Sequence, residues 1–445
     1  MIQVKEDRDL FLSQFERLEK SLGGQAWLRP IRKAAISRFV DLGFPTTRHE
    51  EWRFTNVAPI AKGAFEPANA DPADVTPEQI EALAFGDATA ALLVFVNGRY
   101  VSELSRAETL PDGVQICSLG AALEAGGQVV QRHLARYADY EDQAFTALNT
   151  ALMEDGAFVH IPRGTIVEAP IHLLFVAATN GRKLASHPRN LIVVDANSQV
   201  TIVESYIGLS DDEYFTNTVT EVVAGENAVV DHYKIERESD AAFHISTLHL
   251  HQHRSSNVTS HTVSIGGALV RNNINTVLDG EGCECTLNGL YLVTGTQHVD
   301  NHLNVDHAKP HCNSREFFKG ICDGKGRGIF SGRIIVRKDA QKTDAKQSNM
   351  SLLLSKDAQV ESKPQLEILA DDVKCTHGAT IGQVNGEAIF YLRTRGISES
   401  AARNLLVYAF AREILDRIRI ETLRAQLEEL LVARLRQGQL LQEAV

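Results

Sequence analysis

Residues 197–229 read NSQVTIVESYIGLSDDEYFTNTVTEVVAGENAV, and this stretch decides the fold. It contains runs rich in valine, threonine and aromatic residues that are separated by small polar turns, a pattern typical of β-strands. The turn at Asn197–Val200 returns as Glu226–Val229 after 29 residues, and as Ser255–Val258 after 29 more. A period made only of strands and turns indicates a solenoid, in which each coil buries its strands against its neighbours.

The repeat continues less regularly toward the C-terminus. Polar turns precede strand-like runs at Glu281–Cys283, Lys325–Ile329 and Ala358–Val360, which end 25, 46 and 31 residues after the turn before them. We interpret the spacing of 46 residues as about two periods. The runs are not followed by crossover helices, which excludes a doubly wound α/β sheet. A two-sheet sandwich stays an alternative to a β-helix-like stack, which the period favours.

Helical periodicity appears on both sides of the strand region. Residues 1–85 carry apolar side chains at helical spacing, and residues 86–155 form a mixed connecting region with a helical stretch near 120–153. From 397 to 445, leucine and isoleucine again recur at helical spacing. The sequence therefore predicts a mainly β protein with a parallel β-helix core over residues 156–396, flanked by N-terminal and C-terminal α-helical regions.

Composition and charge restrict the class of protein. The chain has 445 residues, of which 44% are hydrophobic and 23% charged, so a sizeable core can form. Its net charge of −12 disfavours binding to nucleic acid or to an anionic membrane. The apolar runs are too short to span a bilayer, and the N-terminus lacks the apolar stretch of a secretory signal. Together with six sparse cysteines, interpreted as free thiols, these features predict a cytoplasmic protein.

Cys375-Thr376-His377, near the end of the strand region, is the best candidate for chemistry. On a strand, Cys375 and His377 project from the same face, which places a thiolate and an imidazole side by side. Such groups bind iron or zinc. A buried cysteine beside a surface histidine stays the alternative. The chain has none of the standard nucleotide-binding, hydrolase or dehydrogenase motifs.

A second set of candidate metal ligands is the alternating row His249, His251 and His253, whose side chains share one face of a strand. Cys283 and Cys285 would share a face in the same way. Coils stacked in a solenoid would bring such rows together, and imidazole and thiolate suit zinc or iron. The alternative is ordinary polar surface, and the chain lacks a C-x-x-C pair.

The C-terminal region carries a long apolar stripe at helical spacing. Its first part is a candidate partner-binding surface made of Leu405, Leu406, Phe410, Ile414 and Ile418. An amphipathic helix must bury its apolar face, either on a partner or on the chain's own core. Both possibilities stay open on the pattern alone.

Three stretches of the chain resemble a known family. Lys374–Gly382 and Phe390–Ile397 are similar to the C-terminal core signature of the SufB/SufD family, which belongs to the Suf system of iron–sulfur cluster assembly. Glu50–Thr55 is similar to a motif of the D component of that family. Gly378 and Ile381–Gln383 also favour the D component, as does the lack of a C-x-x-C pair. The resemblance spans nearly the whole chain.

The resemblance implies a right-handed parallel β-helix and a non-catalytic scaffold role. In the family, the D component pairs with SufB through the β-helix cores and docks the SufC ATPase through its C-terminal helices. Sulfur comes from a cysteine desulfurase system, and ATP is bound by SufC only. His377 would be a ligand of a transient iron–sulfur cluster with Cys375 beside it, and the isolated chain would hold no stable cofactor. Self-pairing into a homodimer is also plausible by this resemblance.

Two other functions stay open at this point. A homodimeric metal-binding or iron-delivery β-helix protein would use the row from His249 to His253 and would carry tightly held metal when isolated. A β-helix polysaccharide lyase is the second, but such enzymes are commonly exported, and the sequence shows no export signal.

Overall fold

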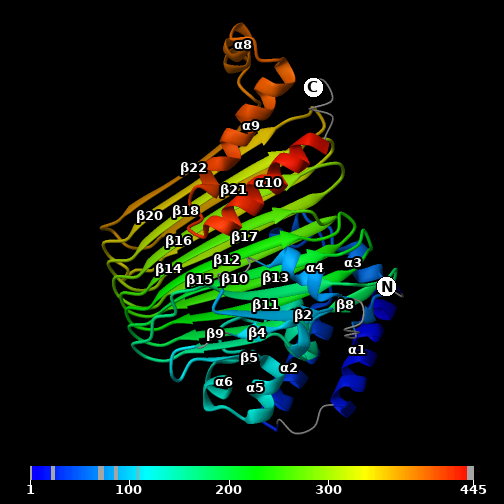
Figure 1. The fold of residues 1–445 in the computed structure, drawn as a ribbon. Helices are drawn as coiled ribbons and strands as arrows, with labels where there is room; N and C mark the ends of the chain where they lie inside the picture. The colour runs from blue at the N-terminus through cyan, green and yellow to red at the C-terminus, as the bar shows by residue number, and fades with distance from the viewer. Residues whose placement is uncertain (1–2, 22–25, 69–74, 85–88, 108–109, 438–445) are drawn as a thin grey trace.

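The computed structural model describes residues 3–21, 26–68, 75–84, 89–107 and 110–437. It is mainly β, with a parallel β-helix of about eight turns and helices at both ends (Figure 1). Two eleven-stranded sheets, here named sheet A and sheet B, face each other, and the chain passes alternately from one to the other. The predicted fold class, a β-helix core between helical regions, is confirmed.

Each coil of the core contributes one strand to each sheet. Sheet A consists of β1 (Glu66–Pro67), β5 (Gln115–Ser118), β6 (Ala157–Ile161), β8 (Leu184–Ser186), β9 (Arg189–Val194), β11 (Phe215–Ala224), β13 (Phe243–Gln252), β15 (Leu269–Leu278), β17 (His298–His307), β19 (Arg327–Val336) and β21 (Gln359–Ile368). Sheet B consists of β2 (Ala91–Val96), β3 (Arg99–Tyr100), β4 (Arg106–Ala107), β7 (Ile171–Ala177), β10 (Gln199–Gly208), β12 (Val229–Arg237), β14 (Asn257–Ile265), β16 (Glu284–Val293), β18 (Asn313–Cys322), β20 (Asp344–Leu353) and β22 (Lys374–Gly382).

The strand register defines the length of a coil. One row of parallel partners in sheet B runs through Gln199, Val229, Asn257, Glu284, Asn313, Asp344 and Lys374. Coils are therefore 27 to 31 residues long, close to the spacing of 29 found in the sequence.

One interpretation of the repeat is wrong. Lys325–Ile329 leads into β19 of sheet A, whereas Glu281–Cys283 precedes β16 of sheet B. The spacing of 46 residues is therefore about one and a half coils rather than two. The physical reason is that a coil has two strands, so a polar turn occurs twice in each coil.

The polar turns before the sheet B strands hold residues with positive φ. Asn197, Asn227 and Ser255 have φ values between 57° and 58°, a region where Asn is enriched. The turns also stack on one another. The N–H of Asn227 donates to the carbonyl of Arg254 at 2.9 Å, and the N–H of Ser255 donates to that of Glu281 at 2.9 Å. Backbone pairing thus continues through the turns and maintains the period.

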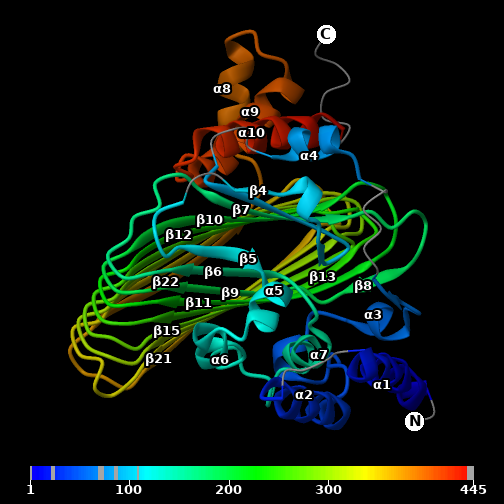
Figure 2. The same ribbon diagram turned by 60° about the horizontal axis from the view of Figure 1, so that its bottom comes forward.

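Helices cover the outer faces of both sheets (Figure 2). The helical elements are α1 (Gln3–Ser21), α2 (Leu28–Leu42), η1 (Glu50–Trp52), α3 (Ala58–Lys62), α4 (Pro77–Leu83), η4 (Ser102–Leu104), α5 (Leu119–Ala125), α6 (Gln128–His133), α7 (Ala144–Leu152), α8 (Gly386–Thr394), α9 (Glu399–Leu415) and α10 (Glu421–Gln437). α1, α2 and α7 form an aromatic-rich core with the outer face of sheet A, and α9 and α10 pack on the outer face of sheet B. Within the described ranges, no helix is both long enough and apolar enough to cross a membrane.

The helices and strands of the structure do not by themselves test the predicted domain boundaries. β2, in the predicted connecting region, pairs with β7 and belongs to sheet B. α8 lies before residue 397, where the predicted C-terminal region begins. The boundaries therefore stay predictions.

The stretch Glu50–Thr55 ties the N-terminal region to sheet A. Trp52 is buried, and the guanidinium of Arg271 lies 3.9 Å from the centroid of its ring. Arg271 also pairs with Asp300 at 2.5 Å, and the Thr55 hydroxyl donates to the same carboxylate oxygen at 2.6 Å. A cation–π contact and a buried ion pair thus hold this motif on β15 and β17.

Candidate functional site

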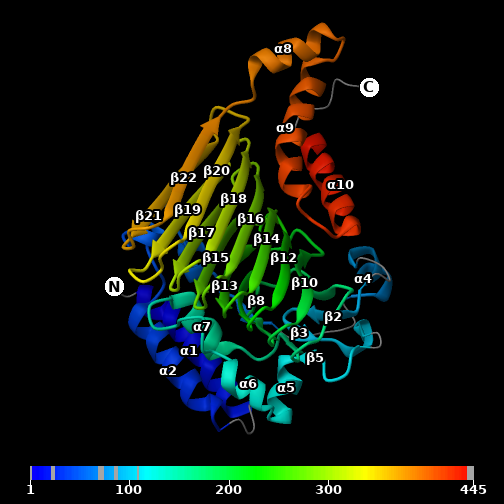
Figure 3. The ribbon, with the colours of Figure 1, turned by 90° about the vertical axis from the view of Figure 1, so that its left-hand side faces the viewer.

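The last strand of sheet B, β22, carries the predicted ligand pair. Cys375 lies beside Ala345, and His377 beside Gln347, in the register with β20. Cys375 is half-buried and packs against the core between the sheets, so the inward face of β22 carries both residues. His377 is exposed, and among the described residues no strand pairs with the far edge of β21 or β22. The pair lies at this open end of the β-helix (Figure 3).

The thiol of Cys375 is protonated at neutral pH. Burial is the main cause that raises its pKa, and the carboxylate of Asp344 raises it further, while a hydrogen bond with the backbone of Ala345 acts in the opposite direction. A metal ion can bind sulfur only after displacing this proton. Binding at Cys375 would therefore release a proton and become stronger as the pH rises.

The pair supplies part of a metal centre. A thiolate and an imidazole are ligands that iron and zinc accept, but a tetrahedral site needs four. In the part of the chain that the structure describes, no group of three or more His, Cys, Asp or Glu side chains is arranged to hold a metal ion. A metal or cluster at Cys375 and His377 would thus need further ligands beyond those that the described residues bring together.

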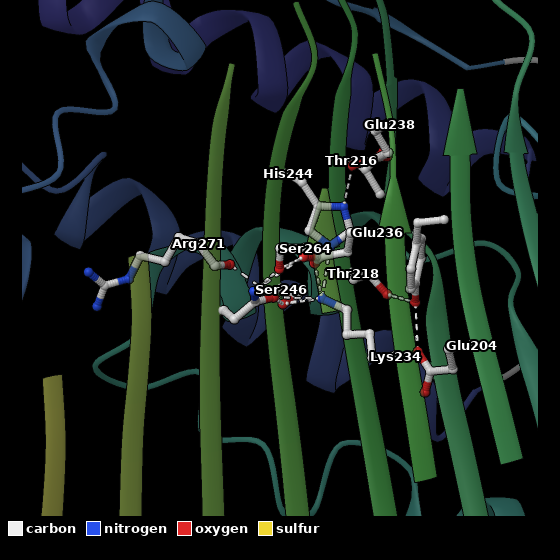
Figure 4. A network of polar contacts seen from close by, with 12 residues as sticks. Glu204, Thr216, Thr218, Lys234, Glu236, Glu238, His244, Ser246, Ser264 and Arg271 are labelled. Carbon is white, nitrogen blue, oxygen red and sulfur yellow. Dashed lines mark hydrogen bonds and ion pairs between the residues drawn. The ribbon is translucent and has the colours of Figure 1, made fainter. Parts of the chain in front are cut away.

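The sequence analysis missed a buried polar network inside the β-helix (Figure 4). Lys234 of β12 donates from Nζ to Ser246 Oγ at 2.6 Å and to Asn272 Oδ1 at 2.8 Å, both on sheet A. The same ammonium group contacts the carboxylate of Glu236, its neighbour on the strand. Lys234 therefore links the two sheets across the interior.

His244 lies between two carboxylates of this network. Its Nε2 lies 3.0 Å from Glu236 Oε1, and its Nδ1 lies 2.7 Å from Glu238 Oε2. Burial acts to lower the pKa of His244, but the two carboxylates outweigh burial and raise it. Lys234 and His244 in turn hold the pKa of Glu236 well below its usual range, although burial acts to raise it. Lys234 Nζ also lies 3.0 Å from His244 Nε2, so this ring nitrogen lies within reach of both the ammonium group and the Glu236 carboxylate.

The histidine row lies on the outer face of sheet A. His249 and His251 belong to β13, and His253 follows its end. The rings of His251 and His253 are 5.0 Å apart between centroids, and the ring of Tyr137 lies 4.9 Å from His251. Burial lowers the pKa of His249 to about 4. His249 and His251 pack against the ring of Tyr137, and the role of the row as a metal site stays a prediction.

The C-terminal stripe mainly faces sheet B. Ile414 and Ile418 are buried in a cluster with apolar residues of that sheet, and Leu406 and Phe410 are half-buried. Leu405 is 48% exposed. Packing on the chain's own core therefore accounts for Ile414 and Ile418, and the partner-binding role of the five residues stays a prediction.

Further apolar surface lies on α8, which projects beyond the sheets (Figure 3). Phe390 is 68% exposed and Tyr391 is 58% exposed. The sequence analysis used these two residues only as part of a family signature. Large exposed aromatic side chains on a projecting helix are typical of interaction surfaces.

The fold and the site together define a class: a two-sheet parallel β-helix with a cysteine and a histidine at its open end. Residues 175–410 match the family model described as the SufBD core domain of the SUF system for FeS cluster assembly, and residues 4–173 match the SufBD protein N-terminal region. The chain belongs to the SufBD family, as its motifs predicted.

Relatives of this chain are similar to it over most of their length. An iron–sulfur cluster assembly SufBD family protein of Synechocystis is 36% identical over 406 residues, which cover 89% of each chain. The iron–sulfur cluster assembly protein SufD of Escherichia coli is 32% identical over 399 residues, covering 89% of this chain and 90% of the relative. SufD of Bacillus subtilis is 26% identical over 411 residues, covering 90% and 92%.

Proposed function

We propose that this chain is a non-catalytic, D-type scaffold subunit that supports the assembly of iron–sulfur clusters in the cytoplasm. The observation that carries the proposal is the open end of the β-helix, where Cys375 and His377 share the inward face of the last strand. The similarity to two proteins named SufD supports the D-type assignment.

The partner at the open end would be SufB, which pairs core to core. β21 and β22 are edge strands, and backbone groups at such edges pair readily with another chain. Exposed apolar side chains line the same coil at Ile368, Leu369 and Ile381. These features support a strand-edge interface. A second copy of this chain would use the same edge, so a homodimer is the competing outcome.

The nascent iron–sulfur cluster is the cargo of this interface. His377 supplies an imidazole ligand, Cys375 lies beside it as a second candidate ligand, and SufB supplies the remaining ligands. Clusters are usually held by thiolates, and an imidazole in place of one changes the electronic properties and lability of the cluster. The cluster is transient, and sulfur reaches it from the cysteine desulfurase system.

The SufC ATPase would dock at the C-terminal helices. Phe390, Tyr391 and Leu405 provide exposed apolar surface there. ATP is bound by SufC only, which fits a sequence without a nucleotide-binding motif. Because α9 and α10 cover sheet B, deletion of the helices would expose that sheet. Substitution of Phe390 and Tyr391 by serine is therefore the cleaner test of docking.

The test of the proposed function is co-expression of the chain with SufB and SufC, followed by purification through a tag on this chain alone. We expect both partners to co-purify, and His377→Ala to lower the cluster yield without changing their recovery. His311→Ala, on an exposed turn, is the matched control. A chain that elutes without partners and carries tightly held metal would overturn the proposal and favour the homodimeric iron-delivery alternative.

A further inference from the structure

A column of three polar residues runs beneath the open end of the β-helix. Glu316 on β18 pairs in register with Gln347 on β20, and Gln347 pairs with His377 on β22. All three lie on the inward face of sheet B, since they alternate with outward residues as Cys375 does. Glu316 is 2% exposed and Gln347 is 3% exposed, so the column ends in two fully interior polar groups.

The two interior members are bonded to each other. Gln347 Nε2 donates to Glu316 Oε2 at 2.5 Å. The remaining oxygens, Glu316 Oε1 and Gln347 Oε1, have no hydrogen-bond partner among the described residues. A buried acceptor without a partner is unusual in a folded protein and calls for an explanation. Gln347 is the register neighbour of His377 on the adjacent strand, and adjacent strands lie about 5 Å apart in the hydrogen-bonding direction of the sheet.

The opposite sheet is shaped to hold the Gln347 carboxamide. A Cβ atom built on Gly332 of β19 would lie 2.3 Å from Gln347 Nε2 and 2.7 Å from its Cδ. A residue larger than glycine would therefore displace the carboxamide. The side chain of Gln347 crosses the interior and is confined between Gly332 and Glu316.

Glu316 is the neutral end of the column. Burial raises the pKa of Glu316 to about 8, against a smaller opposing effect of the Gln347 hydrogen bond. The group is thus a carboxylic acid at neutral pH and brings no negative charge under the open end. A neutral acid can both accept from the amide N–H and donate, which suits a role in orienting an amide.

We propose that Gln347 is a positioning residue for His377: its carboxamide oxygen accepts the N–H of the imidazole, and Glu316 fixes the carboxamide in that orientation. The bond selects one tautomer and directs the other ring nitrogen, with its lone pair, out of the open end. Histidines that bind metals generally donate their second ring N–H to an acceptor that sets tautomer and ring orientation. The inference rests on the proposed function of His377 as a cluster ligand.

The direct test reads the tautomer of His377 and does not need a cluster. The full chain is labelled with [15N]histidine, and the ring resonances of His377 are identified by their absence in His377→Gln. We expect one tautomer to dominate in the wild type. Gln347→Met, which keeps the length but removes the acceptor, should shift the tautomer ratio about fivefold, the change in equilibrium that one net hydrogen bond produces.

Two further variants separate positioning from a general effect on folding. Glu316→Leu should change the ratio as Gln347→Met does, whereas Glu316→Gln, which keeps an acceptor for Gln347 Nε2, should preserve it. Asn349→Leu is the matched control, because Asn349 is a buried inward amide on the same strand that pairs with Ala379 instead. An unchanged tautomer ratio in Gln347→Met and Glu316→Leu would overturn the inference.

The complex gives a second readout that distinguishes the two proposals. With SufB and SufC bound, Gln347→Met should release iron to a chelator roughly 10 to 100 times faster than the wild type, the usual effect of removing an outer hydrogen-bond partner of a metal ligand. If His377→Ala leaves the cluster yield unchanged, the proposed function fails even when the tautomer bias is present. If His377→Ala lowers the yield but Gln347→Met matches the wild type in both assays, only the positioning role fails.

Discussion

The buried acid Glu316 should make the stability of the chain depend on pH in a way that a single substitution removes. Burial raises its pKa to about 8 in the folded chain, from 4.5 when exposed. Between these values the folded chain holds a proton that the unfolded chain releases, so stability falls as the pH rises. The contribution is fully present below pH 4.5 and is lost as the pH passes 8. Each pH unit between these limits costs about 1.4 kcal/mol.

Glu316→Gln keeps the shape of the side chain and an acceptor for Gln347 but cannot ionise. From pH 5 to pH 7, the stability of the variant relative to the wild type should therefore rise by about 3 kcal/mol. Equilibrium urea unfolding at pH 5, 6, 7 and 8, followed by circular dichroism, measures the difference. Glu281→Gln, on an exposed turn, is the control and should give a parallel profile. A constant difference between Glu316→Gln and the wild type at all four pH values would refute a buried neutral acid.

Three further outcomes are expected. Lys234→Met should destabilise the chain by about 3–5 kcal/mol, because it leaves the buried carboxylate of Glu236 under-compensated, and adding Glu236→Gln should recover part of the loss in urea unfolding. Arg271→Ala should lower the free energy of unfolding by about 3–5 kcal/mol in the same measurement, because it leaves the buried carboxylate of Asp300 without its ion-pair partner. The same variant should speed tryptic cleavage of the Glu50–Thr55 segment, which Arg271 contacts through Trp52. The raised pKa of Cys375 should make its alkylation by iodoacetamide slow at pH 7 and faster toward pH 9, as read by mass spectrometry.

The period of the core could be predicted from the sequence because similar polar turns recur at a regular spacing. Asn197, Asn227 and Ser255 stand where the backbone has positive φ, and few residue types are favoured there, so the same polar pattern returns in each coil. The spacing of 46 residues was misread because turns on the two sides of a coil look alike. Only the register shows which sheet a strand joins.

The charged interior could not be predicted by the same reasoning. In β12, Lys234 and Glu236 alternate with Tyr233 and Ile235, which is the pattern of a strand with one solvent-facing side. Here both sides are buried, because helices cover the outer face while the opposite sheet covers the inner one. The partners of Lys234 on sheet A come from strands that are distant in the sequence. The residues next to Lys234 in the sequence therefore do not indicate that its charge is buried.

The C-terminal stripe illustrates a similar limit. Helical spacing correctly placed apolar residues on one side of the C-terminal region, but periodicity does not identify the surface that the stripe covers. For Ile414 and Ile418 that surface is sheet B of the same chain. The exposed residues Phe390 and Tyr391 lie on α8, outside the stripe. Their exposure in the structure, and not the sequence pattern, identifies them as surface residues.

The two ends of the β-helix differ in a way that bears on its function. At the N-terminal end, β3 and β5 pair antiparallel with β2 and β6, which breaks the parallel repeat, and Tyr100, Leu110, Val114 and Ile116 pack against the first coil. At the other end, Leu366, Val373 and Cys375 are the half-buried residues of that core, and within the described ranges the ladder stops at β21 and β22 without a cap. Terminal coils of solenoids usually carry a polar cap, and edge strands pair readily with other chains, so these edge strands support the partner proposed at this end. A partner strand that paired with this edge would also cover His377. The partner's metal ligands would then lie near the imidazole that we propose Gln347 and Glu316 orient.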